Sequence, residues 1–289
     1  MTLIDALQTN LGLLIFAAAL LGLIAGSFLN VVILRLPRMM EIAWQQECRE
    51  TLDLAIESSE KLSLMSPSSR CNGCGARIKP WQNIPVISWL LLRGRCAACK
   101  TSVSIQYPLV EAATGVMFAV CAHKFGWSPQ LLAALVFTAA LVTLTVIDLR
   151  TQLLPDAITL PLMWLGLLLS FWPLFADMPS ALAGAIAGYL SLWSVFQLFR
   201  LITGKEAMGY GDFKLLAALG AWLGWQSLPM IILLSSVVGA TVGIGLIVLR
   251  RQGKEIPIAF GPYLAAAGWI ALIWSNSITA AYLSSTGLG

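Results

Sequence analysis

Long apolar segments separated by polar ones are the feature that most limits what this chain can fold into. Eight of them follow one another along the sequence, at 11–34, 105–122, 129–147, 158–175, 180–199, 213–226, 228–249 and 258–283. A helix that crosses a bilayer needs about 20 mainly apolar residues. A mean hydropathy of +0.82 with 11% charged residues excludes a disordered chain and a large soluble catalytic domain. We predict an all-α polytopic membrane protein with about eight transmembrane helices.

The first and the sixth of these segments differ from the rest. The first, 11–34, has no positive residue before it and ends at Arg35 without a small-residue cleavage site. We therefore expect a membrane span rather than a removable signal peptide. The sixth, 213–226, is short, and a tilted or partly re-entrant helix is an alternative for it.

The Lys and Arg residues predict how the helices are oriented. With the N-terminus outside, the cytoplasmic segments are 35–104, 148–157, 200–212 and 250–257. Of the 18 Lys and Arg residues, 17 lie in or beside these segments and Lys124 lies outside, in agreement with the positive-inside rule. This partition needs an even number of spans. A net charge of +4 distributed in this way gives no reason to expect a nucleic-acid partner.

The spans divide the chain into three parts. We predict a first transmembrane helix (1–37), a cytoplasmic insert (38–104) and a membrane core of about seven helices (105–289). Within the insert, 39–69 has mixed charges and apolar residues at mostly helical spacing. This predicts an amphipathic helix that packs on the next module or on the lipid headgroups, with regulation as the alternative. The oligomeric state stays open.

Four cysteines of the insert form two short motifs. Cys71 and Cys74 make one CxxC pair, and Cys96 and Cys99 make another after 21 intervening residues. Each short turn lets two thiolates converge on one ion, so the pattern predicts a zinc-binding loop with four cysteine ligands at 71–99. Four thiolates close the coordination shell, and such a metal stabilises the loop rather than activating water. Disulfides, a thioredoxin-like redox pair and an iron–sulfur cluster are the alternatives, and a cytoplasmic location disfavours the disulfides.

Two aspartates stand at the ends of apolar segments. Asp148 closes the third segment and Asp212 opens the sixth, so the predicted topology puts both at the cytoplasmic edge of the membrane. Two close carboxyl groups share a proton, so that one can accept a proton from an attacking water while the other donates one to a scissile carbonyl. Gly209 and Gly211 would let a substrate strand or a partner helix approach closely. A plain loop-to-helix turn and helix-end capping explain these residues equally well.

Two further carboxylates are informative. Glu111 lies inside the second apolar segment, where it needs a polar partner or a wet cavity. The sequence does not separate a structural from a catalytic role for it. Asp156 directly precedes the fourth apolar segment, and we expect it to cap that helix.

Five motifs, in this order, resemble the bacterial type IV prepilin peptidase family, the leader peptidases and N-methyltransferases of pilus and type II secretion systems. They are 26–37 (GSFLNVVILRLP), the paired CxxC motifs around 84–89 (IPVISW), 107–111 (YPLVE), 148–156 (DLRTQLLPD) and 209–214 (GYGDFK), and the match extends to 260–263 (FGPY). The GxGD pattern alone occurs in other intramembrane aspartic proteases. The cysteine motifs in front of it make the combination specific.

The resemblance implies roles for particular residues. Asp148 and Asp212 correspond to the catalytic aspartates, and Gly209, Gly211 and Lys214 belong to the supporting motif. The family implies an aspartic peptidase of the bacterial inner membrane, with its active site facing the cytoplasm. It cleaves the basic leader from prepilins and pseudopilins after a glycine and methylates the new amino terminus from S-adenosylmethionine. Arg35 and Lys214 are candidates to pair with a negative charge in the substrate helix.

Two other classes of function compete with this interpretation. A secondary transporter would use carboxylates to relay protons, but its site would lie near the bilayer midplane, and the sequence has no internal repeat. A non-catalytic assembly subunit would use the cysteine loop only for docking. That alternative predicts that pilin processing survives replacement of both aspartates by asparagine.

Overall fold

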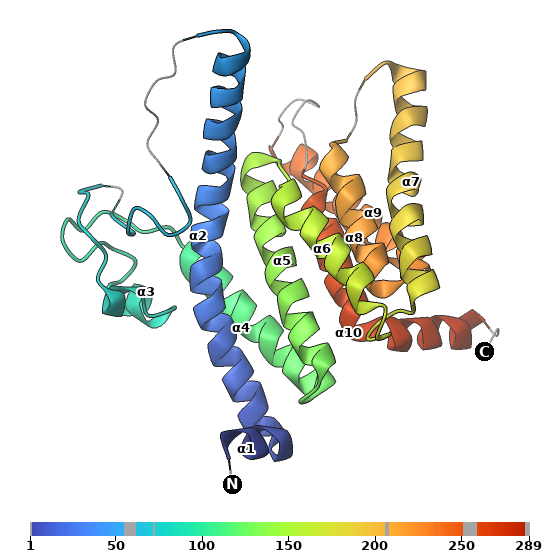
Figure 1. The fold of residues 1–289 in the computed structure, drawn as a ribbon, viewed down its shortest axis with the longest axis horizontal. Coiled ribbons are helices and arrows are strands. Elements are labelled where there is room, and N and C mark those ends of the chain that lie inside the picture. The colour runs from blue at the N-terminus through green and yellow to red at the C-terminus, as the bar shows by residue number, and fades with distance from the viewer. Residues whose placement is uncertain (1, 55–61, 72, 206–207, 251–258, 287–289) are drawn as a thin grey trace. The chain divides into compact units, whose positions relative to one another are not determined.

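The computed structural model describes residues 2–54, 62–71, 73–205, 208–250 and 259–286 (Figure 1). In these ranges the regular structure is helical, and each of the eight apolar segments contains a helix, although the fourth segment continues beyond the helix that ends at Leu169. The prediction of an all-α protein is therefore confirmed. The chain forms two compact units, residues 1–131 and 132–289. The predicted boundaries at 37 and 104 were drawn from the expected membrane spans rather than from compact units, and that division stays a prediction.

Unit 1 contains two long packed helices and a short-helix insert between them. Its elements are α1 (Leu3–Thr9), α2 (Leu11–Thr51), the 3-10 helix η1 (Pro80–Asn83), α3 (Ile87–Leu91) and α4 (Gln106–Phe125). α2 and α4 pack together, and small residues let their backbones approach. At Gly22 and Gly26 a Cβ atom would lie 2.7 Å from backbone atoms of α4. The buried Asn30 amide ties the two helices further, because its Nδ2 donates to the Tyr107 carbonyl oxygen at 3.1 Å.

α2 runs past the predicted end of the first span. It continues through Pro37 to Thr51, so the beginning of the insert is a continuation of the membrane helix. The expected amphipathic helix over 39–69 is therefore wrong in its second half, where 62–69 is irregular; residues 55–61 lie outside the described residues. Carbonyl groups of this irregular stretch bond to the Arg35 guanidinium instead of closing helical turns.

Unit 2 is a bundle built around α8. Its elements are α5 (Pro129–Thr151, which begins at the end of unit 1), α6 (Asp156–Leu169), α7 (Met178–Thr203), α8 (Tyr210–Leu223), the 3-10 helix η2 (Trp225–Ser227), α9 (Leu228–Arg250) and α10 (Gly261–Thr286). Residues 215 to 222 of α8 are all buried. α6, α7 and α10 each pack on this helix.

Glycines permit this close packing around α8. Gly166 on α6, Gly188 on α7 and Gly268 on α10 each face atoms of α8 that a Cβ would strike. Trp222 fills the space beside α6, and its indole Nε1 donates to the Leu162 carbonyl oxygen at 2.7 Å. α8 is thus held on several sides by contacts that leave no room for larger side chains.

Helix length separates two groups of apolar helices. Among the described residues, α2, α5, α7 and the stretch Trp225–Gly245 are long and apolar enough to cross a membrane. α6 and the Gly261–Trp274 part of α10 are shorter apolar helices. These lengths agree with an integral membrane protein, and the number of eight crossings stays a prediction.

Candidate active site and cysteine site

Unit 2 brings Asp148 and Asp212 together from two helices. Asp148 lies in the last turn of α5 and Asp212 in the first turn of α8. Both side chains are buried, with 4% and 7% of their surfaces exposed, and their carboxylates are close enough for their charges to interact. Among the described residues, no group forms a hydrogen bond with Oδ2 of Asp148 or Oδ1 of Asp212. Such orphan oxygens are costly in a protein interior and indicate a functional site.

Two glycines and one leucine shape the surroundings of this pair. A Cβ atom at Gly261 would lie 2.6 Å from Asp148 Oδ2, and one at Gly211 would lie 2.7 Å from Leu154 Cβ. The backbone N–H of Gly261 also donates to the Asp148 carboxylate. At Gly209, in contrast, no atom of the described residues lies within 4 Å of the position that a Cβ would take. The structure therefore requires glycine at 211 and 261 but shows no steric reason for it at 209.

The capping alternative does not describe these aspartates. The residue that caps α8 is Gly209, which makes no side-chain cap, and Asp212 lies three positions further on. Asp148 stands at the C-terminal end of α5, where the helix dipole disfavours a negative charge. Helix stability therefore does not account for Asp148, whereas Asp212, in the first turn of α8, gains from the helix dipole without capping the helix.

Lys214 has a partner inside the protein. Its Nζ lies 2.7 Å from both carboxylate oxygens of Asp156, which ties the start of α6 to the first turns of α8. The prediction that Asp156 caps α6 is wrong, because the cap position is Pro155 and Asp156 is the first helical residue. Its carboxylate takes the ion pair instead.

Glu111 has the polar partner that its place in an apolar segment demands. It is buried, and its Oε2 accepts a hydrogen bond of 2.8 Å from the backbone N–H of Val86 in the insert. Ser27 of α2 also donates to this carboxylate. Val86 has a positive φ of 59°, a conformation that is unfavourable for a β-branched residue. Glu111 thus fixes a strained backbone turn of the insert against α2 and α4.

Arg35 also binds the insert. Its guanidinium donates to the carbonyl oxygens of Ser63, Leu64 and Pro67 at distances between 2.6 and 3.2 Å. These bonds occupy the side chain that the sequence suggested for pairing with the substrate. Arg35 therefore joins the membrane helix α2 to the insert.

The four insert cysteines converge on one point. Their sulfur atoms all lie within 4.8 Å of one another, and Sγ of Cys71 and Cys99 are 3.7 Å apart. Four sulfurs at about 2.3 Å from a zinc ion would be about 3.8 Å from one another in a tetrahedron. The quartet therefore fits a metal ion of this size. Hydrogen bonds from the side chain and the backbone of Thr101 lower the pKa of the Cys99 thiol to about 6, which favours the thiolate that a metal needs.

A helical membrane fold with two buried, neighbouring aspartates from separate helices is the arrangement of an intramembrane aspartic peptidase. Comparison with known families agrees with this class in both units. Residues 20–125 match the bacterial peptidase A24 N-terminal domain, and residues 135–244 match the type IV leader peptidase family. The chain belongs to the type IV leader peptidase family.

Curated relatives are similar over almost their whole length. The chain is 53% identical to a protein of Stutzerimonas stutzeri, with 98% of each chain covered, and 52% identical to one of Pseudomonas aeruginosa, with 99% of each covered. A protein of Neisseria gonorrhoeae is 49% identical, with 90% of this chain and 91% of the relative covered. All three are named prepilin leader peptidase/N-methyltransferase. No solved structure matches the chain.

Proposed function

We propose that this chain is a bifunctional membrane enzyme that removes the leader peptide from prepilins and methylates the new amino terminus. The observation that carries the proposal is the pair of buried aspartates, each with an oxygen that no group in the described protein satisfies. The family and the names of the relatives support both activities. They also favour an enzyme over the transporter and the assembly subunit.

Asp148 and Asp212 would act together on one water molecule. Because two nearby carboxyl groups do not readily both ionise, the pair holds one proton between them. The ionised carboxylate takes a proton from water as the water oxygen attacks the scissile carbonyl carbon, and the protonated carboxyl gives its proton to the carbonyl oxygen. When the tetrahedral species collapses, the C–N bond breaks and the leaving nitrogen takes the proton that the first carboxylate accepted from water. The second carboxylate takes back a hydroxyl proton as the carbonyl re-forms, so that the pair again holds one proton. Gly211 and Gly261 let the Leu154 side chain pack against the backbone beside the pair, and Gly261 does the same for the Asp148 carboxylate.

The topology of unit 2 supports cleavage at one membrane edge. Asp148 ends α5 and Asp212 begins α8, and α6 and α7 lie between them in the sequence. If α6 crosses the membrane and α7 crosses it in the opposite direction, both aspartates lie on the same side of the membrane. With the N-terminus outside, this side is the cytoplasm, where the basic leader of a substrate would remain while its apolar helix lies in the inner membrane. We extend the proposal to pseudopilins and to cleavage after a glycine on the family resemblance.

The cysteine quartet would hold a structural zinc ion. Cys71, Cys74, Cys96 and Cys99 would supply four thiolates, which leave no open coordination position, so the ion would stabilise the fold of the insert. S-adenosylmethionine would supply the methyl group when bound. The residues that would hold it are not assigned.

Product mass tests the peptidase and its aspartates. Purified protein is incubated with a model prepilin and S-adenosylmethionine, beside Asp148→Asn, Asp212→Asn and the control Asp177→Asn. Asp177 is an exposed carboxylate of the same unit, so its replacement changes the charge without touching the pair. We expect loss of the leader and gain of one methyl group in wild type and control, and an unchanged substrate in the other two. Turnover in either single variant would remove that aspartate from the mechanism.

A second experiment separates the cysteine site from the peptidase. We expect about one zinc ion per chain, and we expect Cys96→Ser to lose it. Cys48→Ser should keep the ion, because Cys48 lies on α2 outside the quartet. We expect Cys96→Ser to lose methylation more than proteolysis. Iron with visible absorbance, or no metal, in the wild-type protein would contradict the zinc assignment, and normal methylation by Cys96→Ser would contradict the second expectation.

A further inference from the structure

The insert presents an apolar surface formed by η1, α3 and the residues between them. Ile87, Leu90 and Leu91 are exposed on one face of α3, at the spacing that places side chains side by side on a helix. Trp81 of η1 is 63% exposed and Leu91 is 78% exposed. The Ser88 side chain lies on the other face of α3, because it is buried and its hydroxyl donates to the Gln82 carbonyl oxygen at 2.6 Å. We call these exposed apolar side chains of Trp81 to Leu91 the α3 surface.

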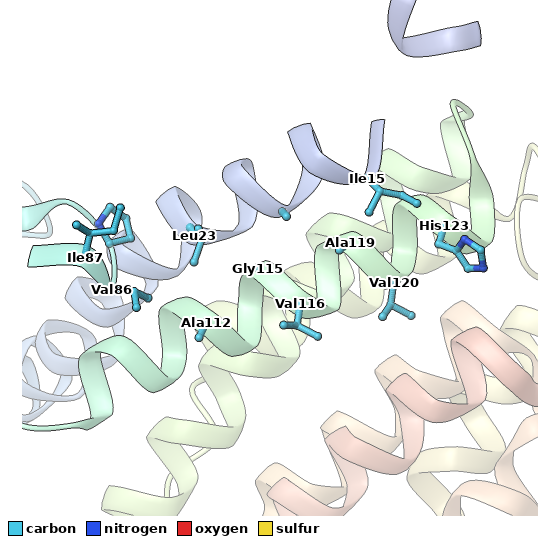
Figure 2. Close-up of a pocket in the computed structure, with 12 residues that line it drawn as sticks. Ile15, Leu23, Val86, Ile87, Ala112, Gly115, Val116, Ala119, Val120 and His123 are labelled. Atoms are coloured by element: carbon cyan, nitrogen blue, oxygen red, sulfur yellow. The ribbon is translucent and has the colours of Figure 1, made fainter. Parts of the chain in front are cut away.

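This surface is continuous with the apolar side of the membrane helices. Val86 and Ile87 form one end of a groove along α2 and α4, as Figure 2 shows, and Ile15 and His123 lie at its other end. Apart from His123, the residues that line the groove are apolar. Ile87 belongs both to the groove and to the α3 surface. One unbroken apolar area therefore runs from the sides of two membrane helices onto the insert.

Hydrogen bonds fix the α3 surface at this position. Glu111 of α4 accepts from the Val86 N–H at 2.8 Å, and the Asn83 side chain donates to Ser27 of α2 at 3.3 Å. Asn83 ends η1 and Val86 caps α3, so both short helices are tied directly to membrane helices. The surface is therefore held against positions inside the two predicted spans 11–34 and 105–122.

The charges around the α3 surface have one sign. Residues 70–100 contain six Lys and Arg residues and no Asp or Glu. Four thiolates on a divalent ion would still leave this module with a net charge of four positive. Lys79, whose Nζ lies 5.2 Å from the centre of the Trp81 ring, stands at one end of the surface, and the exposed Arg93 and Arg95 follow it at the other end. Apolar side chains flanked by cations match a membrane surface with anionic headgroups.

We infer that the α3 surface is an anchor that binds the cysteine module to anionic phospholipid. The exposed leucines and Ile87 contact acyl chains, which continue into the groove along α2 and α4. Trp81 lies at the level of the headgroups, where its ring is favoured. Lys79 and Arg93 bind the phosphate groups. A basic leader peptide is a poor ligand for such a module, because its charge has the same sign.

Hydrogen exchange of the full-length protein in nanodiscs tests this anchor. The reporters are amides within α3 and its following turn, such as Leu90 N–H to the Val86 carbonyl and Gly94 N–H to the Trp89 carbonyl. One set of discs contains phosphatidylcholine alone, and the other contains equal amounts of phosphatidylcholine and phosphatidylglycerol. We expect slower exchange in the anionic discs, by roughly fivefold for each cation that reaches the surface. High salt should remove the difference.

Two double variants and a control assign the effect to the α3 surface. Leu90→Ser with Leu91→Ser should abolish the protection in both kinds of disc, and Lys79→Gln with Arg93→Gln should remove the difference between them. Control changes Leu52→Ser and Leu54→Ser replace two exposed leucines elsewhere in the insert and should change neither result. Unchanged metal content verifies that each variant keeps its folded cysteine module.

Three results would overturn the inference. The first is equal exchange of the wild-type protein in neutral and anionic discs. The second is full protection in the leucine variant with its metal in place. The third is protection that appears only after a prepilin is added, which would make the α3 surface a protein-binding site.

Discussion

Replacement of Gly261 by alanine should disable the aspartate pair while leaving the fold intact. The new methyl carbon would lie 2.6 Å from Asp148 Oδ2 and 3.1 Å from Leu154 Cδ1, whereas ordinary contact begins at 3.4 Å. The carboxylate must therefore move by about 0.8 Å or the start of α10 must shift, and either change disturbs the bond from the Gly261 N–H. A misplacement of about 1 Å in an active site costs roughly a hundredfold in rate. We expect kcat for leader removal to fall by about this factor.

Gly268→Ala is the matched control on the same helix. Its Cβ would lie 2.5 Å from Leu219 Cδ2, a clash of similar size, but its neighbour is a packed leucine of α8 rather than an aspartate. Overpacking of this kind costs about 1–3 kcal/mol of stability. The assay compares kcat on a model prepilin with thermal unfolding of each variant. Wild-type kcat in Gly261→Ala, or an equal loss of kcat in Gly268→Ala at a temperature where both are folded, would refute the reasoning.

Three further predictions concern other contacts of the structure. Glu111→Ala leaves the half-buried Val86 N–H without its acceptor, which costs up to about 1–3 kcal/mol, and should speed exchange of that amide by up to roughly a hundredfold. Glu111→Gln should do so less, and equal effects would contradict the acceptor role. Trp222→Phe should lower the unfolding temperature without changing KM, since it removes the bond to the carbonyl of α6. In metal-free protein, alkylation of Cys99 should rise with pH around a midpoint near 6, because its lowered pKa makes the thiolate persist down to that pH. Thr101→Val removes the side-chain hydrogen bond and keeps the backbone one, so it should raise this midpoint part of the way to the free value of about 8.5, and an unmoved midpoint would refute the assigned cause.

Much of the fold could be predicted because bilayer spans and metal motifs are local patterns. Each of the eight apolar segments contains a helix, and the two CxxC pairs meet although a long stretch separates them. The meeting of Asp148 and Asp212 was expected from the predicted topology, in which an even number of crossings between the two positions returns the chain to one side. The family was recognisable from motifs that retain their order along the chain.

Other contacts depend on tertiary geometry that no local pattern encodes. The sequence marked Glu111 as needing a partner, but the partner is a backbone N–H, and every residue except proline carries that group. Lys214 on α8 forms an ion pair with Asp156 on α6, and α7 lies between these two helices in the sequence. Rules for helix ends consider only residues near Asp156 in the sequence, so they predicted a helix cap instead of this ion pair. Gly261 lay inside a recognised motif, but only the fold shows that it adjoins Asp148.

The two helices that begin near the aspartates are shorter than the bilayer is thick. α6 and α8 have 14 residues each, which at about 1.5 Å per residue gives roughly 21 Å, against a hydrocarbon thickness of about 30 Å. Lipid beside such helices must thin, or polar loops must lie below the level of the surrounding headgroups. We expect a local depression of the membrane where these helices start, marked by the Lys214–Asp156 ion pair. Through it, water could reach a peptide bond that would otherwise lie in a dry layer, without any opening motion of α8.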